Sequence, residues 1–170
     1  MSIDQRTFRK ALGCFASGVT VVTAIHPTTK APVGVTVSAF CSLSLEPPLV
    51  LFCLGNHTAA LEAYTESGYF AVNILAEGQR DVSIRFASRS ERRFDGQHYE
   101  TWASGAPILP GCLVNMECAL VEARATGDHL VVIGKVLKVK HQEGGSPLVY
   151  FRSSYVEYGG SPTLAGGEGA

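Results

Sequence analysis

Charged residues are scarce in this sequence: Asp, Glu, Lys and Arg make up only 17% of its 170 residues, and the formal net charge is −1. Globular proteins average about 25%. The only basic cluster is Arg85, Arg89, Arg92 and Arg93, so the composition argues against nucleic acid as a partner. A surface poor in charge is explained if part of it is covered in a homodimer, which we therefore expect.

Cysteine is too sparse and too irregularly spaced for a metal site or a disulfide framework. The chain has five cysteines, an odd number, and no two of them have the C-x-x-C spacing. Because most of them lie in apolar runs, we expect reduced core residues of a cytoplasmic protein and no metal site. These residues are Cys14, Cys41, Cys53, Cys112 and Cys118.

Long apolar segments and the common nucleotide motifs are absent as well. No run reaches the roughly 18 consecutive apolar residues of a membrane helix, and the first residues lack the apolar run of a signal peptide. Gly13-x-x-x-x-Gly18 has the glycine spacing of a phosphate-binding loop, but Val19-Thr20 stands where Lys-Ser/Thr is required. There is no Gly-x-Gly-x-x-Gly, His-Glu-x-x-His or Gly-x-Ser-x-Gly run. The sequence thus argues against a membrane protein, a Rossmann domain, a P-loop enzyme and the common hydrolases.

What the sequence does contain is mostly β-strand pattern. Strands are expected at 19–25, 33–40, 49–54, 69–75, 112–123, 130–140 and 148–151, and helices at 4–15, 58–65 and 78–87. Such spacing predicts a mainly β fold over residues 1–158, an antiparallel barrel with two or three flanking helices. The polar stretch 88–105 is expected to be an irregular loop with a functional or interface role. The glycine-rich residues 159–170 are predicted to be a flexible tail.

One stretch, Gly34 to Leu54, organises the chain: GVTVSAFCSLSLEPPLVLFCL. It is predicted to form two strands joined by a hydroxyl-rich corner, with Ser42 and Ser44, and a Pro-Pro turn. Exposed backbone N–H groups and short hydroxyls at such a corner are suited to an anionic or heavily oxygenated ligand. Asn56 and Thr58 follow directly and are candidate caps for the next helix, whose N-terminus is a second anion site.

The same stretch closely resembles the corresponding segment of the short-chain flavin reductases, the small reductase partners of two-component flavin monooxygenases. Three other places agree with that family in the expected order, between about Phe8 and Tyr158. They are FRKALGCFASGVTVVT from Phe8, Arg85-Phe-Ala87, and Gly127-Asp-His129 before an apolar strand. The resemblance implies a Greek-key split β-barrel that binds flavin at a dimer interface.

The resemblance also implies a flavin site. The backbone of Thr36, Val37, Ser38 and Ala39 would bond the rim of the isoalloxazine ring, and Ser42, Leu43 and Ser44 would meet the ribityl chain and phosphate. A phosphate would also be reached by Asn56 and Thr58. Arg85, with Phe86 and Ala87, would contact the flavin phosphate or the adenosine side, where the planar fork of an arginine suits phosphate oxygens.

A nicotinamide site is implied at the other end of the family pattern. His129, in the Gly127-Asp-His129 turn, would contact the nicotinamide cofactor, with Arg152 and Tyr155 of the closing strand nearby. Ser153 and Ser154 stand where a glycine and a basic residue are common in the family. This departure leaves the choice between NADH and NADPH open.

The activity implied is that of an NAD(P)H:flavin oxidoreductase, which passes a hydride to FAD or FMN and supplies reduced flavin to a partner monooxygenase. No catalytic dyad is expected, because the reactive atom belongs to the flavin and the protein supplies placement. Two alternatives remain: an oxidase of the same barrel fold with tightly bound flavin, and a non-catalytic flavin-binding redox module. The sequence does not decide between FAD and FMN.

Overall fold

The computed structural model describes residues 3–159, which form the mainly β, antiparallel fold that the sequence predicted. The helical elements are α1 (Gln5–Leu12), α2 (Glu62–Thr65), the short 3₁₀ helix η1 (Glu77–Gln79) and α3 (Arg80–Ala87). Within the described residues, no helix is both long enough and apolar enough to cross a membrane. Apart from Gly159, the predicted tail at 159–170 lies outside the described residues.

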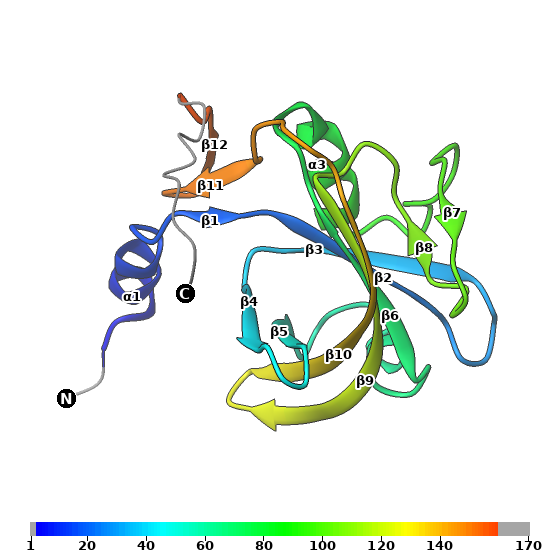
Figure 1. The fold of residues 1–170 in the computed structure, drawn as a ribbon. Coiled ribbons are helices and arrows are strands. Elements are labelled where there is room, and N and C mark those ends of the chain that lie inside the picture. The colour runs from blue at the N-terminus through cyan, green and yellow to red at the C-terminus, as the bar shows by residue number, and fades with distance from the viewer. Residues whose placement is uncertain (1–2, 160–170) are drawn as a thin grey trace.

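Seven antiparallel strands make the main sheet, in the order β3-β2-β6-β9-β10-β5-β4 (Figure 1). Their bounds are β2 (Thr20–Ile25), β3 (Pro32–Val37), β4 (Phe40–Ser44), β5 (Leu49–Gly55), β6 (Tyr69–Ile74), β9 (Val114–Thr126) and β10 (His129–His141). Because β5 pairs with β10 rather than with β6, the connections cross as in a Greek key. The fold is the split barrel expected from the sequence.

The two edge strands of this sheet are consecutive in the chain. Only Ser38 and Ala39 separate the end of β3 from the start of β4. The sheet therefore curls until its edges meet, and the two-residue link spans what we call the seam of the barrel. The organising stretch of the sequence runs along this seam.

The barrel interior is filled by alternate residues of the curled strands. On β5, Val50, Phe52 and Leu54 are buried, while the residues between them are half-buried on the outer face. Phe52 meets Phe70 of β6 edge to face, with ring centroids 5.1 Å apart. Gly134 of β10 lies against the Phe70 ring, where a Cβ would clash. The period-2 pattern read from the sequence is thus the pattern of a closed barrel core.

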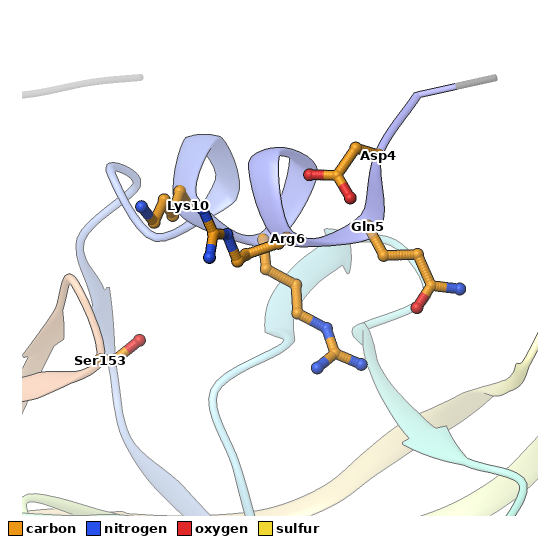
Figure 2. Close-up of a pocket in the computed structure, with 6 residues that line it drawn as sticks. Asp4, Gln5, Arg6, Lys10 and Ser153 are labelled. Carbon is orange, nitrogen blue, oxygen red and sulfur yellow. The ribbon is translucent and has the colours of Figure 1, made fainter.

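Two smaller sheets lie outside the barrel. The first joins β1 (Ser17–Gly18) to the hairpin of β11 (Val149–Phe151) and β12 (Ser154–Val156), and the second pairs β7 (Glu100–Thr101) with β8 (Pro107–Ile108). Helix α1 stands beside the first of these sheets, away from the barrel (Figure 1). Asp4 caps α1, accepting from the backbone N–H of Thr7. Figure 2 shows α1 from close by, with Ser153 of the β11–β12 turn opposite it.

Four local expectations were wrong. The strand expected at 33–40 ends at Val37, and the corner expected at Ser42 to Ser44 is itself an edge strand, β4, paired with β5. The helix expected at 58–65 begins only at Glu62, because Ala60 has a φ of 54° and interrupts it. Asn56 and Thr58 consequently do not cap it: the N-cap is Leu61, which makes no side-chain cap bond. Short polar residues fit a turn as well as a cap, so sequence alone confused the two.

The apolar residues of α1 do not face the core. The exposed fractions of Phe8 and Leu12 are 51% and 57%, and no residue of the helix is buried. The cysteine prediction holds in part. All five cysteines are free, with Cys112 and Cys118 buried and Cys53 half-buried, but Cys14 and Cys41 are exposed.

Candidate functional site

A cavity of about 640 Å³ lies beside the barrel, where β3, the loop after β5 and the end of α3 come together. Its lining comes from three separate segments of sequence. The residues are Val35, Gly55, His57, Thr58, Ala59, Phe86, Ala87, Ser88, Arg89 and Arg93. Thr58, Phe86 and Ala87 are three of the predicted flavin residues, so the tertiary structure brings together positions that lie nearly 30 residues apart.

Helix α3 is held against β3 by two contacts. Gly34 has no side chain, so the ring of buried Phe86 packs directly on its backbone; a Cβ there would lie 2.6 Å from Cε1 of Phe86. One residue pair further along, the hydroxyl of Thr36 donates to the carbonyl of Ser83, 2.6 Å away. The Thr36 side chain is therefore used to position α3, whose last residues form one wall of the cavity.

Two arginines give this wall positive charge. Arg93 donates from Nη1 to the carbonyl of Gly34, at 2.8 Å, which fixes its guanidinium beside β3. Its Nε is buried and has no hydrogen-bond partner. A buried donor without an acceptor costs free energy, about 1–3 kcal/mol for a typical group, until a ligand oxygen supplies one. Arg89, which is exposed, lines the same cavity.

The loop after β5 forms the opposite wall and is tied to the β9–β10 turn. The backbone N–H of Asn56 donates to the carbonyl of Asp128, at 3.0 Å. His129, the first residue of β10, pairs with Gly55. Its Nε2 lies 3.9 Å from the place a Cβ of Gly55 would occupy. The imidazole thus lies next to a residue of the cavity wall.

Asp128 fixes the orientation of that imidazole. Its Oδ1 lies 2.7 Å from Nδ1 of His129. The hydrogen bond to His129, and then the charge of its ring, hold the pKa of Asp128 below its usual value. With Nδ1 engaged by the carboxylate, Nε2 is the ring nitrogen left to meet a ligand.

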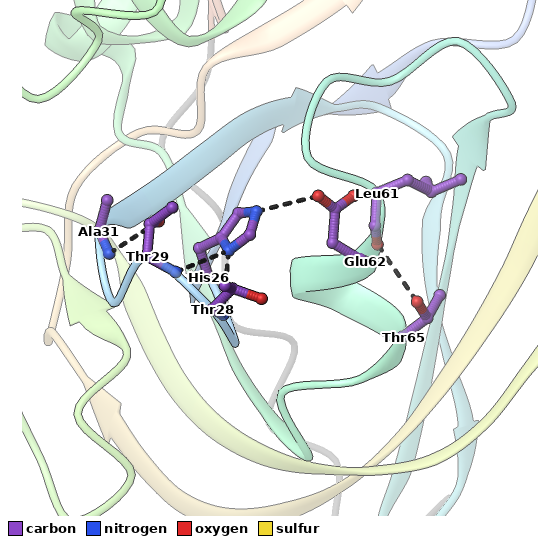
Figure 3. A network of polar contacts seen from close by, with 7 residues as sticks. All are labelled: His26, Thr28, Thr29, Ala31, Leu61, Glu62 and Thr65. Atoms are coloured by element: carbon purple, nitrogen blue, oxygen red, sulfur yellow. Dashed lines mark hydrogen bonds and ion pairs between the residues drawn. The ribbon is translucent and has the colours of Figure 1, made fainter.

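A polar network supports the same loop from behind (Figure 3). His26, at the end of β2, accepts at Nδ1 from the backbone N–H groups of Thr28 and Thr29, both at 3.2 Å. Because that nitrogen accepts, the proton is on Nε2, which donates to the Glu62 carboxylate at 2.9 Å. The bond anchors α2 to the β2–β3 turn and so fixes the far end of the segment that lines the cavity.

The other predicted flavin residues of the organising stretch lie along the seam. Val37 turns its side chain into the barrel core, and its carbonyl accepts from the hydroxyl of Thr20 at 2.9 Å. Ser38 and Ala39 are exposed in the two-residue link. On β4, Ser42 and Leu43 are exposed and Ser44 is half-buried. None of these side chains lines the cavity.

Arg85 also lies outside the cavity. It is exposed on α3, and its Nη1 donates to the carbonyl of Asp95, at 2.9 Å, in the irregular loop that follows. The arginines that line the cavity are Arg89 and Arg93, which the resemblance did not point out. The signal for them was in the sequence, since both belong to the basic cluster between Arg85 and Arg93.

Arg152 and Tyr155 lie on the β11–β12 hairpin, away from the cavity lining. The backbone N–H of Arg152 donates to the carbonyl of Gly13, at 2.8 Å, and joins the hairpin to the end of α1. The hydroxyl of Tyr155 is 2.8 Å from Oγ of Ser83. Tyr155 therefore reaches α3 from behind and connects the hairpin to the helix that borders the cavity.

The described residues contain no cluster of three or more His, Cys, Asp or Glu that could hold a metal. What they do contain is a cavity with an orphaned guanidinium donor, two arginines and glycine-lined backbone, set against a split-barrel seam. Such a site suits a large oxygenated, anionic ligand. Fold and site together define a split barrel with a cavity suited to such a ligand.

Comparison with known proteins narrows the class to a family. Residues 12–159 match the family model described as "Flavin reductase like domain", and the chain belongs to that family. Among its relatives is FMN reductase (NADH) SmoA of Agrobacterium fabrum, 41% identical over 147 residues, which cover 86% of this chain and 82% of SmoA. Another is the flavin-dependent monooxygenase reductase subunit HsaB of Mycobacterium tuberculosis. It is 41% identical over 155 residues, which cover 90% of this chain and 82% of HsaB.

Solved structures agree with this family assignment. The NADH:FAD oxidoreductase SgcE6 of Streptomyces globisporus, in complex with NAD and FAD fragments, superposes with a TM-score of 0.86 at 30% identity. The match covers 96% of this chain and 99% of SgcE6. The split-barrel fold inferred above is thus the fold of solved flavin reductases.

Proposed function

We propose that this protein is an NADH-dependent flavin oxidoreductase that reduces FAD or FMN and supplies the reduced flavin to a partner monooxygenase. The observation that carries the proposal is the cavity beside β3, where Arg93, with its orphaned Nε, lines the same space as Gly55, the strand partner of His129. Family membership supports it, and relatives named as reductase subunits support the monooxygenase partner.

The residues of the cavity fit a flavin. Arg89 and Arg93 would hold its phosphate and polar groups, and Thr58 would bond the remaining oxygens. The backbone of the seam link, which is not part of the cavity lining, would bond the ring edge. When bound, the flavin supplies an electrophilic ring that accepts a hydride and passes on two electrons. Phe86 and Val35 give the cavity an apolar side that excludes water from the ring.

His129 would orient the nicotinamide. Its side chain borders the cavity wall at Gly55, its Nδ1 is held by Asp128, and its Nε2 is left to donate or accept a hydrogen bond. Hydride transfer between two rings requires that they stack at near-attack distance, and the protein contributes chiefly by positioning them. The proposed role of His129 is therefore to position the nicotinamide, and no protein group is required as acid or base.

We also propose that the protein is a homodimer. Phe8 and Leu12 of α1 expose 51% and 57% of their surface, and Phe15, after the helix, exposes 81%. Leu43 and Leu45 expose 46% and 87% beside the seam. Apolar side chains gathered in this way mark an interface. Sedimentation equilibrium should give twice the chain mass, and Phe8→Glu with Leu12→Glu should shift it to the monomer, whereas Ile84→Glu on exposed α3 should not. A monomeric wild type would contradict the proposal.

A spectrophotometric assay tests the function. NADH and NADPH oxidation would be followed with FAD, FMN and riboflavin in turn, and we expect flavin-dependent NADH oxidation by the purified protein. Flavin binding without oxidation of either nucleotide would favour the non-catalytic module. Activity with a flavin that does not exchange with free labelled flavin would favour the oxidase with a prosthetic group. Rapid exchange supports flavin as a substrate.

A further inference from the structure

Ser83 is a fully buried polar residue in the middle of α3, and its hydroxyl forms a hydrogen bond outside the helix. Its exposed fraction is 0%. A serine inside a helix can satisfy its hydroxyl by turning back to a carbonyl of the preceding turn, which bends the helix. Here Oγ lies 2.8 Å from the hydroxyl oxygen of Tyr155, on the β11–β12 hairpin. The hydroxyl of Ser83 therefore joins two elements that are far apart in the sequence.

The ring of Tyr155 is held in place around this bond. The guanidinium of Arg80, one turn earlier on α3, lies 5.3 Å from the ring centroid, within the range of a cation–π contact. The ring of Tyr150 meets it edge to face, with the centroids 5.3 Å apart. Both tyrosines pack against the buried cluster that contains Phe86. The Tyr155 side chain is thus bound to α3 and to the core beneath it, and it does not line the cavity.

Ser83 also joins α3 to β3. Its backbone carbonyl accepts from the hydroxyl of Thr36, at 2.6 Å, so this one residue connects its own helix to the hairpin and to the sheet. Phe86 follows three residues later, on the same face of α3, and lines the cavity. Because α3 has only eight residues, a displacement of Ser83 is passed on to Phe86 and to the wall it forms.

We propose that Ser83 and Tyr155 are positioning residues for flavin binding. Their hydroxyl pair sets the position of α3, and α3 sets the cavity wall formed by Phe86 and Ala87. This inference rests on the proposed function. It gives Tyr155 a role different from the nicotinamide contact that the family resemblance implied, since its hydroxyl is bonded to Ser83 and neither residue lines the cavity.

Removing one of the two hydroxyls disturbs α3 more than removing both. In Tyr155→Phe the hydroxyl of Ser83 loses its partner in a fully buried place, and it turns to a carbonyl of its own helix, which bends α3. In the double variant, which adds Ser83→Ala, no buried hydroxyl is left unpaired, and replacing both partners by apolar groups is nearly neutral. The second substitution should therefore reverse much of the effect of the first.

The test compares wild type with Tyr155→Phe, Ser83→Ala and the double variant, each of which removes one oxygen atom per substitution. Tyr158→Phe is the matched control, at a position whose exposed fraction is 43%. KM for FMN, KM for NADH, kcat and the urea unfolding midpoint are measured for every variant. For Tyr155→Phe we expect KM for FMN to rise about threefold to tenfold, with KM for NADH and kcat within about twofold of wild type. The double variant should recover most of the loss, and the control should match wild type.

A merely structural role gives a different pattern. It lowers the urea midpoint and, through the folded fraction, kcat, while KM for FMN stays unchanged. That pattern would overturn the inference, and so would a double variant in which the two single losses multiply. A rise in KM for NADH alone would overturn it as well, because Tyr155 would then act on the nicotinamide. These outcomes are read from variants of an active protein, whereas a wild type that does not oxidise NADH would refute the proposed function and, with it, the role given to the pair.

Discussion

His129 and Gly55 stand opposite each other in the β5–β10 pair, with Nε2 of the imidazole 3.9 Å from the point where a Cβ of Gly55 would lie. Gly55 lines the cavity against the β3 seam, so this pair joins the nicotinamide residue implied by the family pattern to the cavity that suits a flavin. The two lie 74 residues apart in sequence (129 minus 55) and are brought together by one strand pairing.

The first prediction concerns this imidazole. His129→Ala should raise KM for NADH about threefold to tenfold, the value of one or two hydrogen bonds, and leave flavin affinity unchanged. Steady-state kinetics and flavin titration measure the two effects. His141→Ala, at the exposed far end of the same strand, is the matched control and should behave as wild type. NADH kinetics unchanged in His129→Ala would remove His129 from the site.

The second prediction tests how α3 is positioned. Gly34→Ala places a Cβ 2.6 Å from the Phe86 ring, and the helix has to shift. We expect a loss of about 1–3 kcal/mol in the free energy of unfolding, together with weaker flavin binding, because overpacking moves the cavity wall. Urea denaturation and flavin titration give both values. Gly78→Ala, which meets nothing within 4 Å, is the control. A Gly34→Ala protein as stable as the wild type would show that α3 tolerates displacement.

The third prediction concerns the buried guanidinium. Arg93→Gln should weaken FMN binding by about tenfold or more, because the orphaned Nε donor is lost from the cavity. Arg92→Gln, at the exposed neighbouring position with 84% of its side chain accessible, should leave binding unchanged. Fluorescence titration with FMN compares the two variants. Equal affinity in both would mean that the Arg93 donor meets no flavin oxygen.

The fourth prediction separates phosphate from ring recognition. Arg89 lines the cavity from the chain after α3, and an exposed arginine there suits a phosphate. Arg89→Gln should raise KM for FMN several-fold and leave KM for riboflavin, which has no phosphate, unchanged. Steady-state rates with both flavins at saturating NADH measure this. Equal rises for the two flavins would assign Arg89 a structural role.

The fifth prediction follows from thiol burial. Burial raises the pKa of Cys118 to about 12 and that of Cys112 to about 11. At pH 8 only about one Cys118 thiol in ten thousand is then a thiolate, the reactive form. Iodoacetamide at pH 8 should therefore label exposed Cys14 and spare both buried thiols until the protein is unfolded in guanidinium. Mass spectrometry of the labelled peptides identifies which cysteines have reacted. Rapid labelling of Cys118 in the native protein would contradict the barrel core described here.

Much of this molecule was determined by the sequence itself. The alternation of Val33, Val35 and Val37 and the apolar run of β5 were enough to predict strands. Successive side chains on a strand point to opposite faces, so the pattern can be recognised without knowing which strands pair. The segments that resemble the family predicted the split barrel and the reductase class for a similar reason, because each is a short continuous stretch of sequence. The start of α2 was misplaced because Asn56, His57 and Thr58 serve a turn as readily as a cap.

Only the tertiary structure decided which residues of these segments contact one another. The hydroxyl of Thr36 donates to the carbonyl of Ser83, and Nη1 of Arg85 donates to the carbonyl of Asp95, contacts that the family pattern did not reveal. Arg93 reaches the cavity because its Nη1 bonds the carbonyl of Gly34, 59 residues earlier, and no local pattern encodes that distance. Phe8 and Leu12 of α1 are exposed for a similar reason. Which way a helix face turns depends on what it packs against, and that is set by contacts between segments far apart in the chain.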